Sequence, residues 1–177
     1  MSWRDSWRRF RAADSGSITA EFVILFPVVM YIFLLGIETS LWNTRELMLR
    51  RATNLAVRDV RLSTATPPSY EEMRRAICAR SIFISGCEAN LRIEMQALPL
   101  ADWARVTSQA KCVEKGGAVD PALDYRPGQQ NELMMVRVCR MFDPIFPGGG
   151  LGRKISQEHG GEYAVRVVTG FVAEPRS

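Results

Sequence analysis

An apolar run near the N-terminus constrains this chain more than any other feature. Sixteen consecutive residues without charge extend from Phe22 to Ile37, and beyond Glu38 the residues up to Trp42 are uncharged as well. Counted over 22–42 the run has 21 residues. A helix of that length, at about 1.5 Å per residue, covers roughly 31 Å, against roughly 30 Å of hydrocarbon in a bilayer. The run therefore predicts a membrane-spanning helix at about 22–42.

Two other interpretations of the run are open at this point. A buried core helix would need apolar surroundings on all sides, which is uncommon in a chain of 177 residues. A cleaved secretory signal fits the arginines that precede the run, but no small-x-small cleavage site follows Leu35. We therefore favour the membrane helix.

The charges predict an orientation for this helix. Four arginines within residues 1–16 predict a cytoplasmic N-terminus, with the chain after Trp42 on the far side of the membrane, although three arginines within 45–51 weaken this prediction. Residues 66–177 carry fourteen basic and thirteen acidic residues. A nearly neutral domain is a poor electrostatic match for nucleic acid, so we expect no nucleic-acid partner.

Beyond the apolar run the helix is expected to continue. After Trp42 no glycine or proline occurs before Pro67, and one arc of the helix collects Met48, Ala52, Leu55, Ala56 and Leu62. The predicted organisation is a polar leader over 1–16, a long helix over 17–64 and a head domain over 65–177.

The head is predicted to be an α+β domain with one helix and roughly three antiparallel strands. Ser69 and Glu72 match a capping box, and Gly86 stands where a C-terminal cap would follow the helix. The apolar face of this helix would comprise Tyr70, Met73, Ile77 and Ile84. Alternation of apolar and polar residues predicts strands at 91–97, 132–142 and 162–173.

All four cysteines follow the apolar run, at Cys78, Cys87, Cys112 and Cys139. None forms a Cys-x-x-Cys pair suited to zinc or redox chemistry, so disulfides in an oxidising periplasm fit best. Among the three possible pairings we favour Cys78 with Cys87 and Cys112 with Cys139, because each closes a local loop. The first pair would be about 13 Å apart on one straight helix, so it requires the chain to reverse at Gly86.

Catalytic interpretations have little support. The only histidine, His159, lies between Glu158 and two glycines, as a solvated loop residue would. Residues 148–154 resemble a phosphate loop only superficially, because Gly-Arg-Lys replaces Gly-Lys-Ser/Thr. Glu71 and Glu72 are adjacent on a helix and point about 100° apart. We therefore expect neither enzymatic activity nor a cofactor or metal.

The start of the apolar run carries a more specific pattern. Glu21 follows Gly16 by five residues, Phe22 comes next, and Pro27 lies within the run. With the Val- and Arg-rich strands and the closing Phe171 to Pro175, this pattern resembles the TadE-like pseudopilins of tight-adherence (Tad, or Flp) pilus systems, in the type IV pilin superfamily. The resemblance covers about the first 45 residues well and the rest as a general pattern.

The resemblance implies processing by a membrane-embedded prepilin peptidase, which would cut after Gly16 and leave Ser17 as the new N-terminus. It implies other pilins and pseudopilins, and the inner-membrane assembly platform, as partners, with a pilin-like head in the periplasm. Phe22 stands where the major Flp pilins commonly have Tyr, and cleavage would leave 161 residues. Both features favour a minor pseudopilin. The alternative is an uncleaved single-pass protein whose head binds a secretion or envelope partner.

In this interpretation Glu21 would neutralise the new α-amino group, whose reference pKa is near 8, one helical turn away or on a neighbouring subunit. The alternative is an interfacial glutamate placed favourably for the helix dipole. Pro27 would weaken the helix locally where subunits pack, or would be a tolerated membrane-helix proline.

Overall fold

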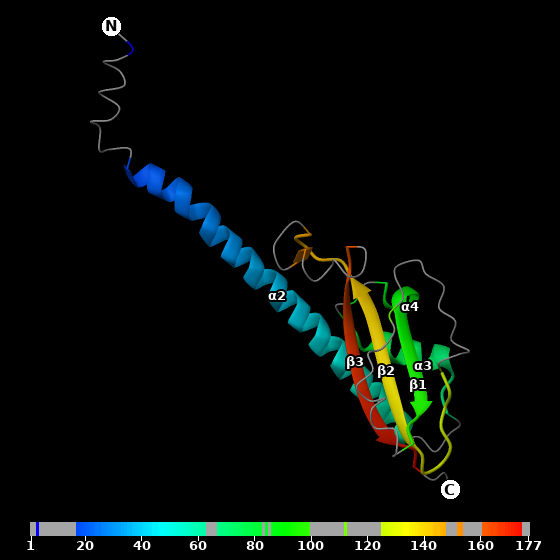
Figure 1. The fold of residues 1–177 in the computed structure, drawn as a ribbon. Coiled ribbons are helices and arrows are strands. Elements are labelled where there is room, and N and C mark those ends of the chain that lie inside the picture. The colour runs from blue at the N-terminus through cyan, green and yellow to red at the C-terminus, as the bar shows by residue number, and fades with distance from the viewer. Residues whose placement is uncertain are drawn as a thin grey trace. The chain divides into compact units, whose positions relative to one another are not determined.

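The computed structural model describes residues 3, 17–62, 67–82, 84, 86–99, 112, 125–147, 152–153 and 161–174. In chain order the elements are α2 (Ser17–Leu62), α3 (Tyr70–Ala79), α4 (Cys87–Asn90), β1 (Leu91–Ala97), β2 (Leu133–Phe142) and β3 (Tyr163–Val172) (Figure 1). The predicted α+β class, with one long N-terminal helix and three strands, is therefore confirmed. The chain divides into two compact units, Met1–Ile37 and Glu38–Ser177.

The strands form one antiparallel sheet in the order β1-β2-β3 (Figure 1). Ile93 pairs with Val138, which pairs in turn with Val167. These three buried residues lie on one face of the sheet because side chains alternate along a strand and the register aligns them. The predicted strand positions are confirmed to within one residue at each end.

The hydrophobic core joins this face to α2 and α3. From α2 it contains Leu49, Ala52, Ala56 and Val57, and from α3 it contains Tyr70, Met73 and Ile77. Leu49, Ala52 and Ala56 are spaced by three and four positions, as on one helix face, and Val57 follows directly. The predicted α2 arc is partly wrong, because Leu55 and Leu62 are exposed whereas Leu49 and Val57 are buried. The sheet selects a face rotated from the one that apolar residues alone suggest.

The capping box at the start of α3 is confirmed. The backbone amide of Glu72 donates to Oγ of Ser69, and the amide of Ser69 donates to Oε2 of Glu72 over 2.8 Å. The hydrogen bonds from Ser69 lower the pKa of Glu72, since they favour the charged carboxylate.

The predicted end of this helix is wrong. The helix ends at Ala79 with Arg80 as its cap, so Ile84 is buried from a later segment and Gly86 is not the cap. Gly86 instead has φ of 63° directly before α4, a left-handed conformation that glycine adopts at little cost. The chain turns there before it enters α4 and β1.

The second face of the sheet carries charge at its centre. Glu94 and Arg137 are buried partners on β1 and β2, with 3.6 Å between the carboxylate and the guanidinium. Arg92 lies 3.5 Å from the same carboxylate. The pairing compensates for the cost of removing these charges from water. Central strand β2 is therefore buried on both faces, unlike a strand with one solvated face.

The core makes a first prediction with a matched control. Ile77 is fully buried, whereas Ile82 is 83% exposed. Ile77→Ala should lower the free energy of unfolding of the full chain by about 2 to 5 kcal/mol, because it removes buried methylene groups and leaves a cavity. Ile82→Ala should change it by less than about 0.5 kcal/mol. Thermal unfolding of the full chain in detergent, followed by circular dichroism, measures both, and equal effects would contradict this assignment of the core.

Candidate functional site

The residues predicted to act in processing and assembly lie at or beside the start of α2. The helix begins at Ser17, directly after Gly16, which lies outside the described residues. Glu21 is therefore one helical turn beyond Ser17, and its side chain is exposed. No acidic residue lies in the first turn of α2. The dipole effect decays within that turn, so it offers Glu21 little stabilisation.

The apolar run forms the exposed surface of the first unit. From Phe22 to Phe33 the large apolar residues are exposed except for half-buried Met30, and the rings of Phe22 and Phe26 lie 5.2 Å apart between centroids. Pro27 lies inside the helix, where it donates no hydrogen bond to the preceding turn. α2 is long and apolar enough to cross a membrane, and none of its most apolar stretch is buried. A core helix would be buried, so these observations are consistent with a single-pass membrane anchor.

A site that the sequence did not indicate begins at Glu38, the first residue of the second unit. Its side chain is only 4% exposed although α2 is strongly apolar just before it. The amide of Ile145 donates to both carboxylate oxygens, at 3.2 and 3.1 Å, and the amide of Phe146 donates to Oε2 at 3.1 Å. Glu38 therefore fastens the loop that follows β2, residues 143–147, to α2.

Arg45, two turns further along α2, holds the same loop from a second position. It donates to the backbone carbonyl of Asp143 at 3.1 Å and to the hydroxyl of Tyr163. Its guanidinium also lies 4.9 Å from the ring centroid of Phe142, within the range of cation–π attraction. The ends of β2 and β3 thus meet α2 around one cation.

Burial and the positive charge of Arg45 shift the pKa of two side chains at this end of the sheet. Burial raises the pKa of Tyr163, while the hydrogen bond and positive charge of Arg45 act to lower it. Burial and the nearby Arg45 both lower the pKa of Arg140, whose guanidinium donates to the carbonyl of Gly86. Hydrogen bonds to fixed backbone and hydroxyl groups stabilise these charges, so the arrangement suits a structural role.

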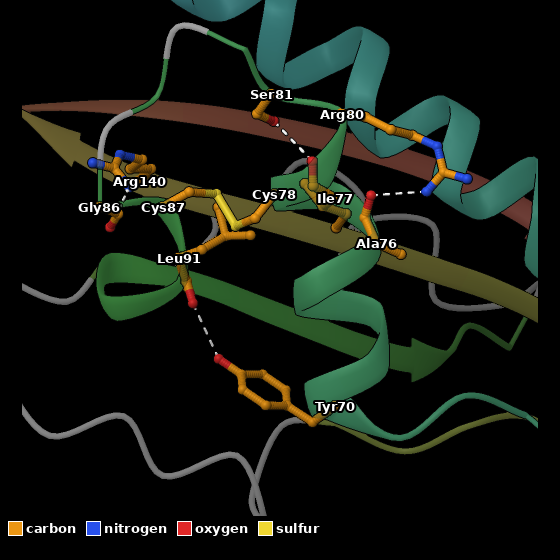
Figure 2. Close-up of a disulfide and its surroundings, with 10 residues drawn as sticks. All are labelled: Tyr70, Ala76, Ile77, Cys78, Arg80, Ser81, Gly86, Cys87, Leu91 and Arg140. Carbon is orange, nitrogen blue, oxygen red and sulfur yellow. Dashed lines mark hydrogen bonds between the residues drawn. A yellow bond between two sulfur atoms is a disulfide. The ribbon is translucent and has the colours of Figure 1, made fainter.

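The cysteines form the two predicted disulfides. Cys78 bonds to Cys87 with 5.6 Å between Cα atoms, and Cys112 bonds to Cys139 with 5.3 Å. Figure 2 shows the first disulfide between the end of α3 and the start of α4, with the hydroxyl of Tyr70 donating to the carbonyl of Leu91. The turn at Gly86 brings the two cysteines together, as the sequence required.

Within the described part of the chain, the remaining catalytic candidates form no reactive cluster. His159 and most of residues 148–154 lie outside the described residues. Glu72 caps α3, and Glu71 pairs with Arg74, as expected for a helix surface. Among the described residues no group of His, Cys, Asp and Glu could hold a metal ion.

Comparison with known proteins identifies the N-terminal segment. Residues 16–58 match the model of a family described as TadE-like protein. No curated protein and no solved structure was found to match the chain. The predicted resemblance to the TadE-like proteins is therefore confirmed for these residues, and it supports involvement in the Tad pilus system. The match begins at the glycine before α2 and ends within the part of α2 that the head covers.

The Glu38 site makes a second prediction. In Glu38→Gln an amide donor replaces one carboxylate oxygen and faces a backbone donor, so the loop should lose about 1.5 to 3 kcal/mol of stabilisation. Hydrogen exchange at Ile145 and Phe146 should then accelerate by roughly ten- to a hundredfold. Glu46→Gln, which removes a carboxylate paired with Arg50 on the same helix, should leave this exchange unchanged. Unaltered protection in Glu38→Gln would contradict the proposed fastening.

Proposed function

We propose that this protein is a non-enzymatic minor pseudopilin that takes part in assembly of a tight-adherence pilus after a prepilin peptidase cuts it between Gly16 and Ser17. The observation that carries the proposal is the TadE-like segment, which starts at Gly16, together with a helix that starts at the next residue. Its partners would be the peptidase, other pilins and pseudopilins, and the inner-membrane assembly platform.

The position of Glu21 supports this function chemically. Cleavage would create a protonated α-amino group at Ser17, and Glu21 lies one turn above it with an exposed side chain. A carboxylate on an apolar helix costs free energy unless a cation compensates it. In a bundle of such helices the new amine would compensate it, within one subunit or between neighbours. Charge pairing would then set the register of packed subunits.

The proposed location is the bacterial inner membrane, with the N-terminus in the cytoplasm and the head in the periplasm. The leader's arginines favour this orientation. Two disulfides in the head fit an oxidising compartment. The second candidate function is an uncleaved single-pass protein whose head binds an envelope partner. That candidate shares the anchor and the disulfides, so processing distinguishes the two.

The third prediction concerns this processing. In cells with active peptidase, the intact mass should show loss of residues 1–16, and Gly16→Val should block that loss because a side chain would obstruct the cleavage site. Gly36→Val is the matched control: its added side chain would begin in open space on the same helix, so cleavage should proceed. An unshortened wild-type chain in such cells would refute the cleavage and favour the uncleaved alternative.

The fourth prediction separates processing from assembly. Glu21→Gln should insert and be cut normally, but it should leave the new amine without its carboxylate. Removing one member of a buried charge pair costs about 3 to 5 kcal/mol in a dry site, and less where water enters. Crosslinking to other pilins and surface adherence should therefore fall.

The control for this experiment is Glu46→Gln, which removes a carboxylate from a part of α2 beyond the apolar run. It should crosslink and adhere like wild type. Normal crosslinking and adherence from a cleaved Glu21→Gln protein would reduce Glu21 to an interfacial helix residue.

A further inference from the structure

We propose that the loop of residues 143–147 is a membrane-contact surface that holds the head against the lipid headgroup layer. The inference rests on α2 spanning the bilayer, and it stands independently of cleavage or pilus assembly. The loop reads Asp-Pro-Ile-Phe-Pro, and Ile145 at its centre is 48% exposed. The proposed occupant is the interfacial layer of a phospholipid bilayer.

The burial of side chains along α2 locates the membrane boundary. From Ile18 to Ile37 no described side chain is buried, and Glu38 is the first that is. The stretch from Ser17 to Ile37 spans roughly 31 Å of helix, which fills the hydrocarbon layer. From Glu38 onward protein covers part of the helix surface, because Glu38 and Leu49 are buried while Ser40 and Leu47 stay exposed. We therefore place the end of lipid contact at Ile37, whereas the apolar run alone predicts an end at about Trp42.

The loop of residues 143–147 lies at that boundary. The amides of Ile145 and Phe146 bind the carboxylate of Glu38 directly. Arg45 holds the start of the loop through the carbonyl of Asp143. Gly152 lies against the backbone of Phe146, where a Cβ atom would come within 2.5 Å of the carbonyl oxygen. Three neighbours thus fix the loop at the helix residue where lipid contact ends.

The side chains at this boundary suit the interfacial layer of a bilayer. Backbone donors cover the carboxylate of Glu38, so this group is not presented to lipid as a bare anion. The exposed Ile145 side chain and the half-buried Phe146 offer apolar surface, which gains free energy when it enters the headgroup and acyl boundary. Trp42, half-buried one turn beyond Glu38, is of the type enriched at membrane interfaces.

The fifth prediction tests this surface with a matched pair of labelled chains. Val172, at the far end of β3 from Tyr163, is 49% exposed, almost the same fraction as Ile145. Tyr163 contacts Arg45, and nine strand residues further on Val172 lies roughly 30 Å away. Ile145→Cys and Val172→Cys would each carry an environment-sensitive fluorophore on the full chain, whose other cysteines are disulfide-bonded. The chains would be reconstituted at low density in phosphatidylcholine vesicles and floated to verify anchoring.

At position 145 the fluorophore should shift to the blue and lose emission to lipids brominated near the headgroup end of the acyl chain. At position 172 it should lose emission to soluble iodide instead. Equal iodide quenching at both positions in floating vesicles would overturn the membrane contact and leave the anchor intact. Shielding at 145 without lipid quenching, increasing with protein density, would assign the loop to a second copy and also overturn it. Chains that fail to float would overturn the span, and the contact with it.

Discussion

The rest of the architecture depends on the contact between Glu38 and the loop after β2. A carboxylate buried without partners would cost several kcal/mol, and part-buried amides without an acceptor would add to that cost. Each group satisfies the other, so the contact stabilises the loop against the helix. The contact also marks a change in environment along α2, because no described side chain before Glu38 is buried, whereas one face of the helix after it joins the core.

Much of the head could be predicted because local alternation decides which side chains can be buried. In β1, Ile93 and Met95 alternate with Arg92, and the structure buries the apolar pair against the helices. The face of α2 was less predictable. Leu55 and Ala56 are apolar neighbours, but only Ala56 belongs to the core, because adjacent side chains point about 100° apart around a helix. The side of the helix that is buried depends on its partner, which local sequence does not specify.

One part of the candidate site could likewise be predicted from the sequence, and another part could not. The spacing from Gly16 to Glu21 is local, so the sequence alone could indicate it, and the family match begins at that glycine. Glu38 could be noticed only as a charge that interrupts an apolar run. Its partner Ile145 lies 107 positions further along the chain, and the bond uses a backbone amide that every residue except proline possesses. No side-chain pattern identifies such a donor, and so the contact required a structure.

The two parts of α2, the exposed apolar run before Glu38 and the part that joins the core, are separate along the sequence. Pro27 is the position where a missing hydrogen bond weakens α2, and it precedes Glu38 by eleven residues, or about three turns. Bending or local melting at Pro27 would thus leave the hydrogen bonds of Glu38 and Arg45 intact. Conversely, the loop and the core protect α2 from about Glu38 to Val57 and not the apolar run. Under the proposed function, packing of subunits through the run could then change without unfolding the head, as a protein that passes from a bilayer into an assembly requires.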